Sequence, residues 1–218
     1  MAFLQDKDKE YIRNMFSSLS NKVKITFFTQ EIGCQYCGDT LQILDETSEL
    51  SGKIELDVKY FSKDKNEVEK YKIDKTPAIV IEGEKDYGIR FYGIPSGYEY
   101  SSLLDDIVDI SKGESGLTPQ SKEMLKKIEK QIHLQVFVTP TCPHCPRAVK
   151  LSHKMAIENE QIVSDMIEAT EFPELSMRYG VRGVPRTMIG EDFSIEGAVP
   201  EDHMIQKVLS AYHEYYSH

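Results

Sequence analysis

Hydrophobic and polar positions along this chain alternate between the period of a helix and the period of a strand. The same order of helical and strand segments occurs twice, once in each half. In the first half, apolar residues at a spacing of three and four predict amphipathic helices, and alternating or continuous apolar runs predict strands. The helices are expected over residues 6–19, from about 40 to 52, 67–71 and 98–111; the strands over 23–29, 54–60, 78–81 and 88–92. Residues 82–86 are expected to turn between the last two strands.

The second half repeats this order. Thr118 is a favourable helix cap, and Pro119, which follows it, is a favourable first residue of a helix. The expected helices cover residues 119–128, 146–157, 172–179 and 202–215, and the strands 132–138, 161–167, 187–189 and 193–196. Between the halves, residues 111–120 are rich in Gly, Ser and Pro. We therefore predict two units, residues 1–116 and 117–218, each of an ordinary size for a domain.

Three landmarks recur at one offset. Cys34 and Cys142 lie 108 positions apart, and the same offset separates Pro77 from Pro185. It also separates Asp57 from Asp165, both inside predicted strands. A shared offset predicts two copies of one structural unit.

Composition narrows the function. The 218 residues carry a net charge of −10, and this acidic balance argues against nucleic acid as a partner, because phosphate contacts need clustered cations. No stretch approaches the ~20 apolar residues of a membrane span, and the first ten residues lack a signal-peptide core. We expect a cytoplasmic protein with no membrane partner.

The four cysteines form two Cys-x-x-Cys motifs, Cys34-Gln35-Tyr36-Cys37 and Cys142-Pro143-His144-Cys145. Each motif follows a predicted strand and precedes a predicted helix, a setting typical of thiol–disulfide redox centres. The alternative is structural zinc. Zinc ribbons separate their two pairs by ~15–20 residues, far less than the spacing here, so we expect redox chemistry, no metal and no cofactor.

The order of elements around each motif resembles the thioredoxin fold. The chain is most similar to the glutaredoxin-like protein disulfide oxidoreductases of thermophilic archaea and bacteria, which are two-domain cytosolic proteins with one redox motif in each domain. The resemblance implies an α/β protein of two tandem thioredoxin-fold units, each a central mixed sheet flanked by helices. It also implies that Thr76-Pro77 and Val184-Pro185 are cis-proline loops that face the cysteines and pair with an extended substrate backbone.

One position departs from the thioredoxin pattern. Thioredoxins carry a buried aspartate, a proton relay, six residues before the first cysteine; this chain has Phe28 and Val136 there. The proton acceptor for the second cysteine of each pair is therefore left open. Asp57 and Asp165 are not taken as candidates, because a strand carboxylate more often belongs to a solvated face.

The expected roles follow from thiol chemistry. A cysteine at a helix N-terminus has a lowered pKa and reacts as the thiolate. Cys34 and Cys142 would attack a substrate disulfide, and Cys37 and Cys145 would resolve the mixed disulfide. His144 would stabilise the Cys142 thiolate and make the second site the more oxidising of the two. Tyr36 lies inside the first motif and Arg147 follows the second, and both are expected to be exposed surface residues without a catalytic role.

We therefore expect an enzyme that reduces, forms or reshuffles disulfides in other proteins. The resemblance implies a thioredoxin-reductase-type flavoprotein as electron donor. Two alternatives stay open: an electron-transfer module that feeds a peroxiredoxin, and a non-catalytic zinc- or partner-binding protein built on thioredoxin folds. A glutathione site around Val184-Pro185 and Gly197 is a further option.

Overall fold

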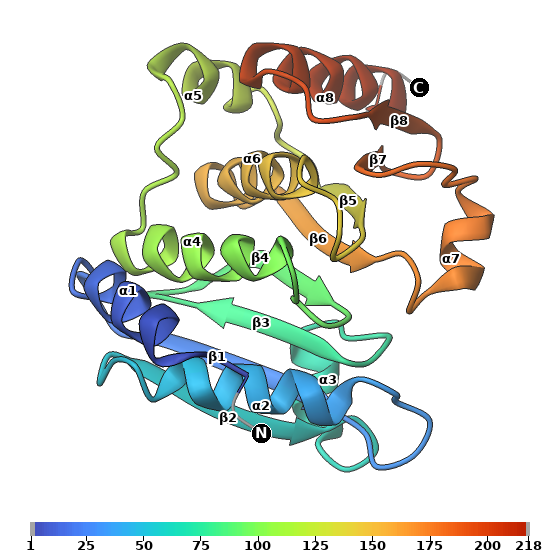
Figure 1. Cartoon of the computed structure of the whole chain (residues 1–218). Coiled ribbons are helices and arrows are strands. Elements are labelled where there is room, and N and C mark those ends of the chain that lie inside the picture. Colours follow the sequence, from blue (N-terminus) through green and yellow to red (C-terminus); the bar gives the residue numbers. More distant parts are fainter. Residues whose placement is uncertain (1–2, 217–218) are drawn as a thin grey trace.

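A computed structural model describes residues 3–216 of the chain (Figure 1). The first half contains α1 (Asp6–Phe16), β1 (Val23–Thr29), α2 (Cys37–Ser48), β2 (Ile54–Tyr60), α3 (Lys65–Lys70), β3 (Ala78–Glu82), β4 (Asp86–Tyr92) and α4 (Glu99–Lys112). The second half contains α5 (Pro119–Leu125), β5 (Ile132–Val138), α6 (Cys145–Glu158), β6 (Ile162–Glu168), α7 (Pro173–Arg178), β7 (Arg186–Ile189), β8 (Phe193–Glu196) and α8 (Glu201–Tyr216). Every predicted helix and strand is present, with ends shifted by a few residues, and the α/β class is confirmed.

The segment between the halves is bounded by two helix ends at residues that favour them. Helix α4 ends at Gly113, whose φ of 67° is the left-handed conformation that glycine adopts most readily. Helix α5 begins at Pro119, and the Thr118 side chain accepts a hydrogen bond from the Ser121 N–H. The exact boundary of the two units at residues 116 and 117 stays a prediction.

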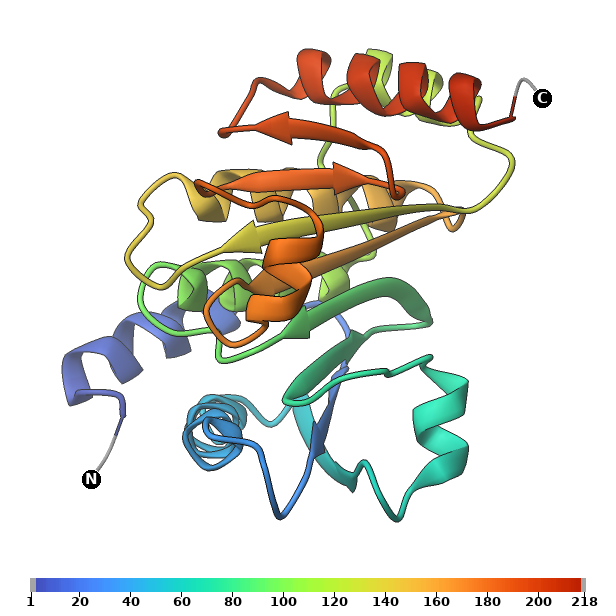
Figure 2. The ribbon, with the colours of Figure 1, turned by 90° about the vertical axis from the view of Figure 1, so that its right-hand side faces the viewer.

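All eight strands form one sheet in the order β2-β1-β3-β4-β6-β5-β7-β8. Within each half the strands pair in the same order: β2-β1-β3-β4 in the first half and β6-β5-β7-β8 in the second. The halves are joined by β4 and β6, which pair in parallel with Ile89 opposite Ser164 and Arg90 opposite Asp165. Neither β4 nor β6 is therefore an edge strand, and a single mixed sheet runs through the molecule (Figures 1 and 2).

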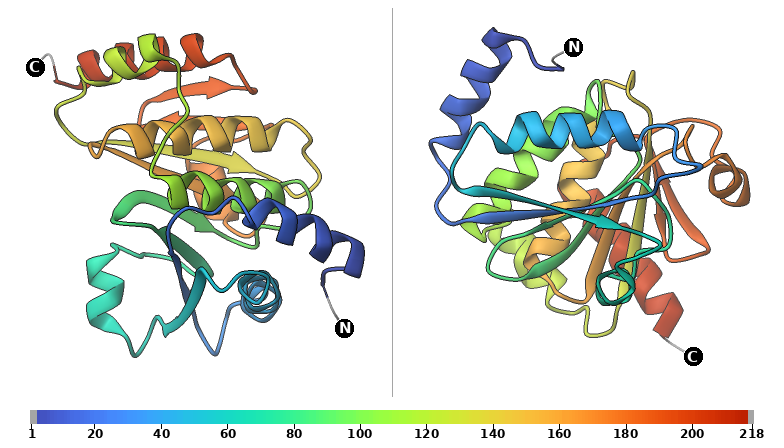
Figure 3. Two further views of the ribbon diagram at one scale, coloured as in Figure 1. Left: turned by 90° about the vertical axis from the view of Figure 1, so that its left-hand side faces the viewer. Right: turned by 90° about the horizontal axis from the view of Figure 1, so that it is seen from below.

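Helices cover the two faces of the sheet unequally. Helices α2, α4, α6 and α8 lie with α1 and α5 over one face, where they share the larger hydrophobic core (Figure 3). Helices α3 and α7 lie over the other face, visible in Figure 2. The repeat is visible there in two equivalent edge-to-face aromatic pairs, Phe28–Tyr71 and Phe137–Tyr179, each with 5.8 Å between ring centroids.

The two halves also meet through α4 and α6, which lie side by side (Figures 1 and 3). At their contact the Asp106 carboxylate and His153 Nδ1 are 2.5 Å apart, and both side chains are buried. Nearer the surface, Lys150 pairs with Asp105 at 2.8 Å. The contact between the units thus combines apolar packing with a buried polar pair between the two helices.

Candidate active sites

Both Cys-x-x-Cys motifs lie at the same place in their units, between the first strand and the helix that follows it. Cys37 is the first residue of α2, and Cys145 is the first residue of α6. Each pair forms a disulfide with 5.5 Å between its Cα atoms. This spacing lies within the normal range for a disulfide, so the two residues between the cysteines allow the pair to close.

The two pairs differ in exposure. Cys34 is half-buried, and Cys37 exposes 5% of its surface. Cys142 exposes 8%, and Cys145 is fully buried. In the loop before Cys34, Ile32 exposes 88% of its surface, an unusual position for so large an apolar side chain. The first site is therefore the more open one.

The two proline loops lie at the same end of the sheet as the motifs. Thr76-Pro77 and Val184-Pro185 are both cis peptide bonds, as the resemblance implied. Pro77 precedes β3, which runs antiparallel to β1, and Pro185 precedes β7, which runs antiparallel to β5. Antiparallel pairing brings each loop to the end of the sheet from which the chain continues into the cysteines.

The chain before α4 packs against the second site. The Tyr98 N–H donates to the Pro140 carbonyl at 3.0 Å, two residues before Cys142. Gly97 has a φ of 60°, and a Cβ there would lie 2.2 Å from the same carbonyl oxygen. This approach therefore requires glycine. The first unit thus packs against the loop that leads into the second unit's redox site.

Glu99 is the functional candidate that the sequence did not reveal. It is the first residue of α4 and exposes 1% of its surface. The Ser102 hydroxyl donates to one carboxylate oxygen at 2.8 Å, and the other oxygen has no partner within residues 3–216. Burial raises the pKa of Glu99 to about 7, an effect that His153 opposes and Asp106 reinforces. A carboxyl group titrating near neutrality can accept and return protons.

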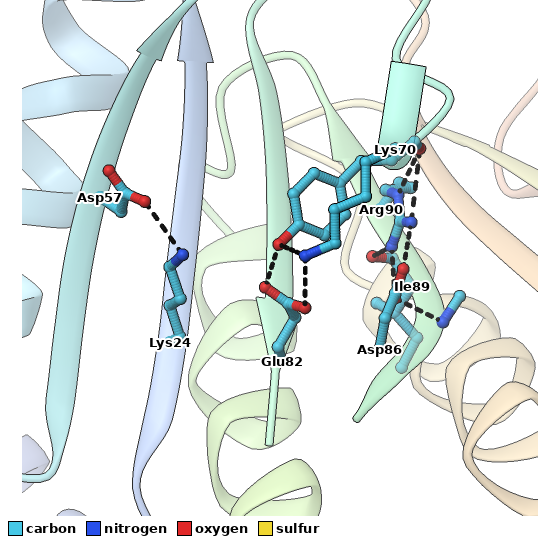
Figure 4. Close-up of polar contacts among 9 residues, drawn as sticks. Lys24, Asp57, Lys70, Glu82, Asp86, Ile89 and Arg90 are labelled. Carbon is cyan, nitrogen blue, oxygen red and sulfur yellow. Dashed lines mark hydrogen bonds and ion pairs between the residues drawn. The ribbon is translucent and has the colours of Figure 1, made fainter. Parts of the chain in front are cut away.

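The repeated aspartates have different environments. Asp57 is half-buried on β2 and pairs with Lys24 and Lys59, each at 2.9 Å; the Lys24 contact appears in Figure 4. Asp165 exposes 3% of its surface and binds His133 Nε2 at 2.7 Å. The expectation of a solvated face is wrong for Asp165, because β4 of the first unit pairs with its strand, whereas β2 is an edge strand.

The remaining flanking residues lie close to where the sequence suggested. His144 is exposed at the start of α6, and its side chain makes no capping hydrogen bond. Arg147 is exposed near the start of α6, as expected, whereas Tyr36 immediately precedes α2 and is half-buried rather than exposed. Their roles at the sites stay predictions.

A structural metal would need further ligands near each cysteine pair. Residues 3–216 contain no group of three or more His, Cys, Asp and Glu side chains arranged to hold a metal ion. Over the same residues, no helix has the length and apolar character needed to cross a membrane.

A family model described as "Thioredoxin domain" matches this chain twice, over residues 21–105 and 132–210. The chain belongs to the thioredoxin-domain family. The two matches contain one Cys-x-x-Cys motif each, so the duplication inferred from the offset of 108 is confirmed.

Two of the similar solved structures cover nearly the whole chain. A protein disulfide oxidoreductase from Aeropyrum pernix is 30% identical, with a TM-score of 0.90, over 96% of this chain and 94% of that one. The N-terminal domain of an alkylhydroperoxide reductase AhpF from Enterococcus faecalis is 24% identical, with a TM-score of 0.88 over 94% of this chain and 100% of that one. The second match shows a shared fold.

Curated relatives are longer proteins. A Bacillus subtilis protein named NADH dehydrogenase is 28% identical over 175 residues, which are 79% of this chain and 32% of that protein. A Staphylococcus aureus component of alkyl hydroperoxide reductase is 32% identical over 128 residues, 56% of this chain and 24% of that protein. The chain thus spans a third or less of the curated relatives it matches.

Proposed function

We propose that the protein catalyses thiol–disulfide exchange with other proteins through both cysteine pairs. The observation that carries the proposal is the location of each disulfide at the start of a helix, at the end of the sheet that also holds a cis-proline loop, in a chain with two thioredoxin units. Helix N-termini stabilise thiolates, and the thiolate is the reactive species. Similarity to the Aeropyrum pernix oxidoreductase supports this function.

In the reductive direction, the Cys34 or Cys142 thiolate attacks a substrate disulfide. One substrate sulfur leaves and takes a proton, and a mixed disulfide remains. The thiol of Cys37 or Cys145 then loses its proton, attacks the mixed disulfide and releases the second substrate thiol. The substrate gains two electrons, and the enzyme's dithiol becomes a disulfide.

The proton released by the second cysteine needs an acceptor, and Glu99 meets this need at the second site. It is buried with one free oxygen, and the segment that leads into it packs against the loop before Cys142. Its pKa of about 7 lies close to neutral pH, where general acid–base groups work best. Thr76-Pro77 and Val184-Pro185 would hold the substrate backbone beside the sulfur atoms.

The physiological flow of electrons has two candidate forms. In one, a thioredoxin-reductase-type flavoprotein reduces the protein, which then acts on cytoplasmic protein disulfides. In the other, the protein passes electrons to a peroxiredoxin; the relatives named as alkyl hydroperoxide reductase and NADH dehydrogenase favour a flavoprotein system of this kind. Two intact cysteine pairs favour the first form.

Insulin reduction with dithiothreitol, alongside metal analysis of the purified protein, tests the proposal. We expect both double variants, Cys34→Ser/Cys37→Ser and Cys142→Ser/Cys145→Ser, to keep part of the activity, and the quadruple serine variant to lose all of it. Stoichiometric zinc with no reductase activity in the natural chain would overturn the proposal. The two candidate routes of electron flow are separated by repeating the assay with the disulfide of a peroxiredoxin as substrate in place of insulin.

A further inference from the structure

The loop before each redox pair has a different residue at one equivalent position. Counted back from the first cysteine of the motif, the second residue is Ile32 at the first site and Pro140 at the second. Two peptide steps of about 3.8 Å keep the Cα atom of each residue within about 7.6 Å of the Cα atom of its cysteine. A protein segment whose disulfide reaches the sulfur of Cys34 or Cys142 therefore passes close to this position.

At the first site this position holds an apolar side chain in solvent, since Ile32 exposes 88% of its surface. The neighbouring charges are paired with each other. The Glu31 carboxylate accepts a hydrogen bond from Lys63 Nζ at 2.6 Å, and the same ammonium group lies 4.6 Å from the centre of the Tyr60 ring. Ile32 is therefore the side chain of this loop that a substrate can cover without breaking an ion pair.

At the second site the first unit brings an aromatic side chain to the equivalent position. The Cys142 N–H donates to the Thr139 carbonyl at 3.1 Å, which closes a turn with Pro140 inside it. The Pro140 carbonyl accepts the Tyr98 N–H at 3.0 Å, and Gly97 allows this approach. Tyr98 exposes 52% of its surface. An exposed aromatic residue of the first unit is thus anchored on the residue that corresponds to Ile32.

The placement of these two side chains matters more than their exposure. Single exposed apolar residues are common on protein surfaces, and seven large ones are exposed within residues 3–216. Ile32 and Tyr98, however, meet the chain at the same position of the repeat, next to the cysteine that would attack a substrate. One belongs to the loop itself and the other to the neighbouring unit, so the correspondence does not follow from the duplication alone.

We propose that each redox site selects its protein substrates through one apolar side chain, Ile32 beside the Cys34 pair and Tyr98 beside the Cys142 pair. The occupant is an extended segment with an apolar residue next to its disulfide cysteine. Partly unfolded proteins offer such segments, because folded proteins bury most of their large apolar residues. The first unit supplies the selecting side chain at both sites. This inference rests on the proposed exchange function, which brings a substrate disulfide to these sulfur atoms.

Two symmetric peptide disulfides test the proposal; they differ only in having leucine or serine on both sides of the cysteine. The prereduced protein reduces each peptide in a single turnover, and chromatography after acid quenching measures the released peptide thiol. Cys142→Ser/Cys145→Ser isolates the first pair, and Cys34→Ser/Cys37→Ser isolates the second. We expect the second-order rate constant to be about tenfold higher for the leucine peptide at each pair, the effect of burying part of one apolar side chain.

Reciprocal variants assign each side chain to its site. Ile32→Ser should reduce the preference for leucine to about twofold or less at the first pair and leave it unchanged at the second. Tyr98→Ser should do the reverse, and serine is a favourable residue at this N-cap position of α4. Ile32→Leu and Tyr98→Phe should keep the preference, because both remain apolar. Tyr11→Ser is the matched control, since it removes an exposed tyrosine from α1, and it should keep the preference at both pairs.

Equal rate constants for the two peptides, with Ile32 and Tyr98 in place, would overturn this inference but leave the exchange function standing, because both peptides are still reduced. A preference that survives Ile32→Ser and Tyr98→Ser would overturn it as well. So would a loss of preference at both pairs from either single variant, since each side chain is assigned to one site. Failure of both pairs to reduce either peptide would refute the exchange function itself, and the inference with it.

Discussion

The two redox sites have the same local design but different surroundings. At the first site the loop before Cys34 is open, and Ile32 is almost fully exposed. At the second site Cys142 and Cys145 are buried, and the start of α4 packs against the preceding loop. The difference arises because the units join through β4 and β6, which places the last helix of the first unit beside the second unit's cysteine helix. A duplicated unit thus becomes two unequal sites without any change in its own fold.

The largest expected effect is on the free energy of unfolding, and it concerns the contact between the two units at α4 and α6. Asp106→Ala leaves His153 buried without its partner, which should lower the free energy of unfolding by about 3–5 kcal/mol. Asp105→Ala is the matched control, because its neighbouring ion pair with Lys150 is partly exposed and should contribute less than about 1 kcal/mol. Urea unfolding measures both. Equal losses would show that the buried pair does not hold the units together.

The pH dependence of stability tests the burial of Glu99. Its folded pKa of about 7 lies above the ordinary 4.5, so the neutral form stabilises the fold fully below pH 4.5. That contribution is lost as the pH rises through 7, by about 3 kcal/mol at most. The loss should be absent in Glu99→Gln. Glu171 has a pKa raised to about 7 by burial and remains in both proteins, so the difference between them isolates Glu99. Parallel stability curves would contradict a buried Glu99.

The same substitution should separate the two sites kinetically. In the Cys34→Ser/Cys37→Ser background, Glu99→Gln should slow disulfide reduction about 100-fold near neutral pH, because the proton acceptor is lost. In the Cys142→Ser/Cys145→Ser background it should change the rate little. Insulin reduction gives both rates. An equal effect in the two backgrounds would mean that Glu99 does not serve the second site specifically.

A smaller effect is expected from the residues inside the motifs. His144→Gln should lower the reduction potential of the second pair by about 30 mV, because a cationic imidazole beside the thiolate stabilises the reduced form. Tyr36→His, the reciprocal change in the first motif, should raise that pair's potential by a similar amount. Equilibration with glutathione buffers measures both shifts. If neither potential changes, His144 does not influence the redox pair.

The sequence predicted the elements well because hydrophobic periodicity is local. The offset of 108 between Cys34 and Cys142 likewise revealed the repeat without any knowledge of tertiary structure. The pairing of β4 with β6 was not predictable in this way, since each strand's pattern says that it is buried but not which neighbour buries it. The environment of Asp165 depends on that pairing and was therefore misjudged.

The sequence did not indicate Glu99 as a functional residue, for a related reason. An acidic residue in the first turn of a helix is ordinary, because it stabilises the helix dipole. Its burial comes from the packing of α4 on α6, which brings residues of two units together. The conventional proton-relay positions hold Phe28 and Val136, so neither unit's own pattern indicates an acceptor.

The inequality of the two sites is tested most directly by the reduction potential of each pair, measured separately in Cys142→Ser/Cys145→Ser and Cys34→Ser/Cys37→Ser. The unlike surroundings of the two sites predict two distinct potentials, and His144 beside Cys142 predicts that the Cys142–Cys145 pair is the more oxidising. Identical potentials, or a lower potential for Cys142–Cys145, would contradict the account.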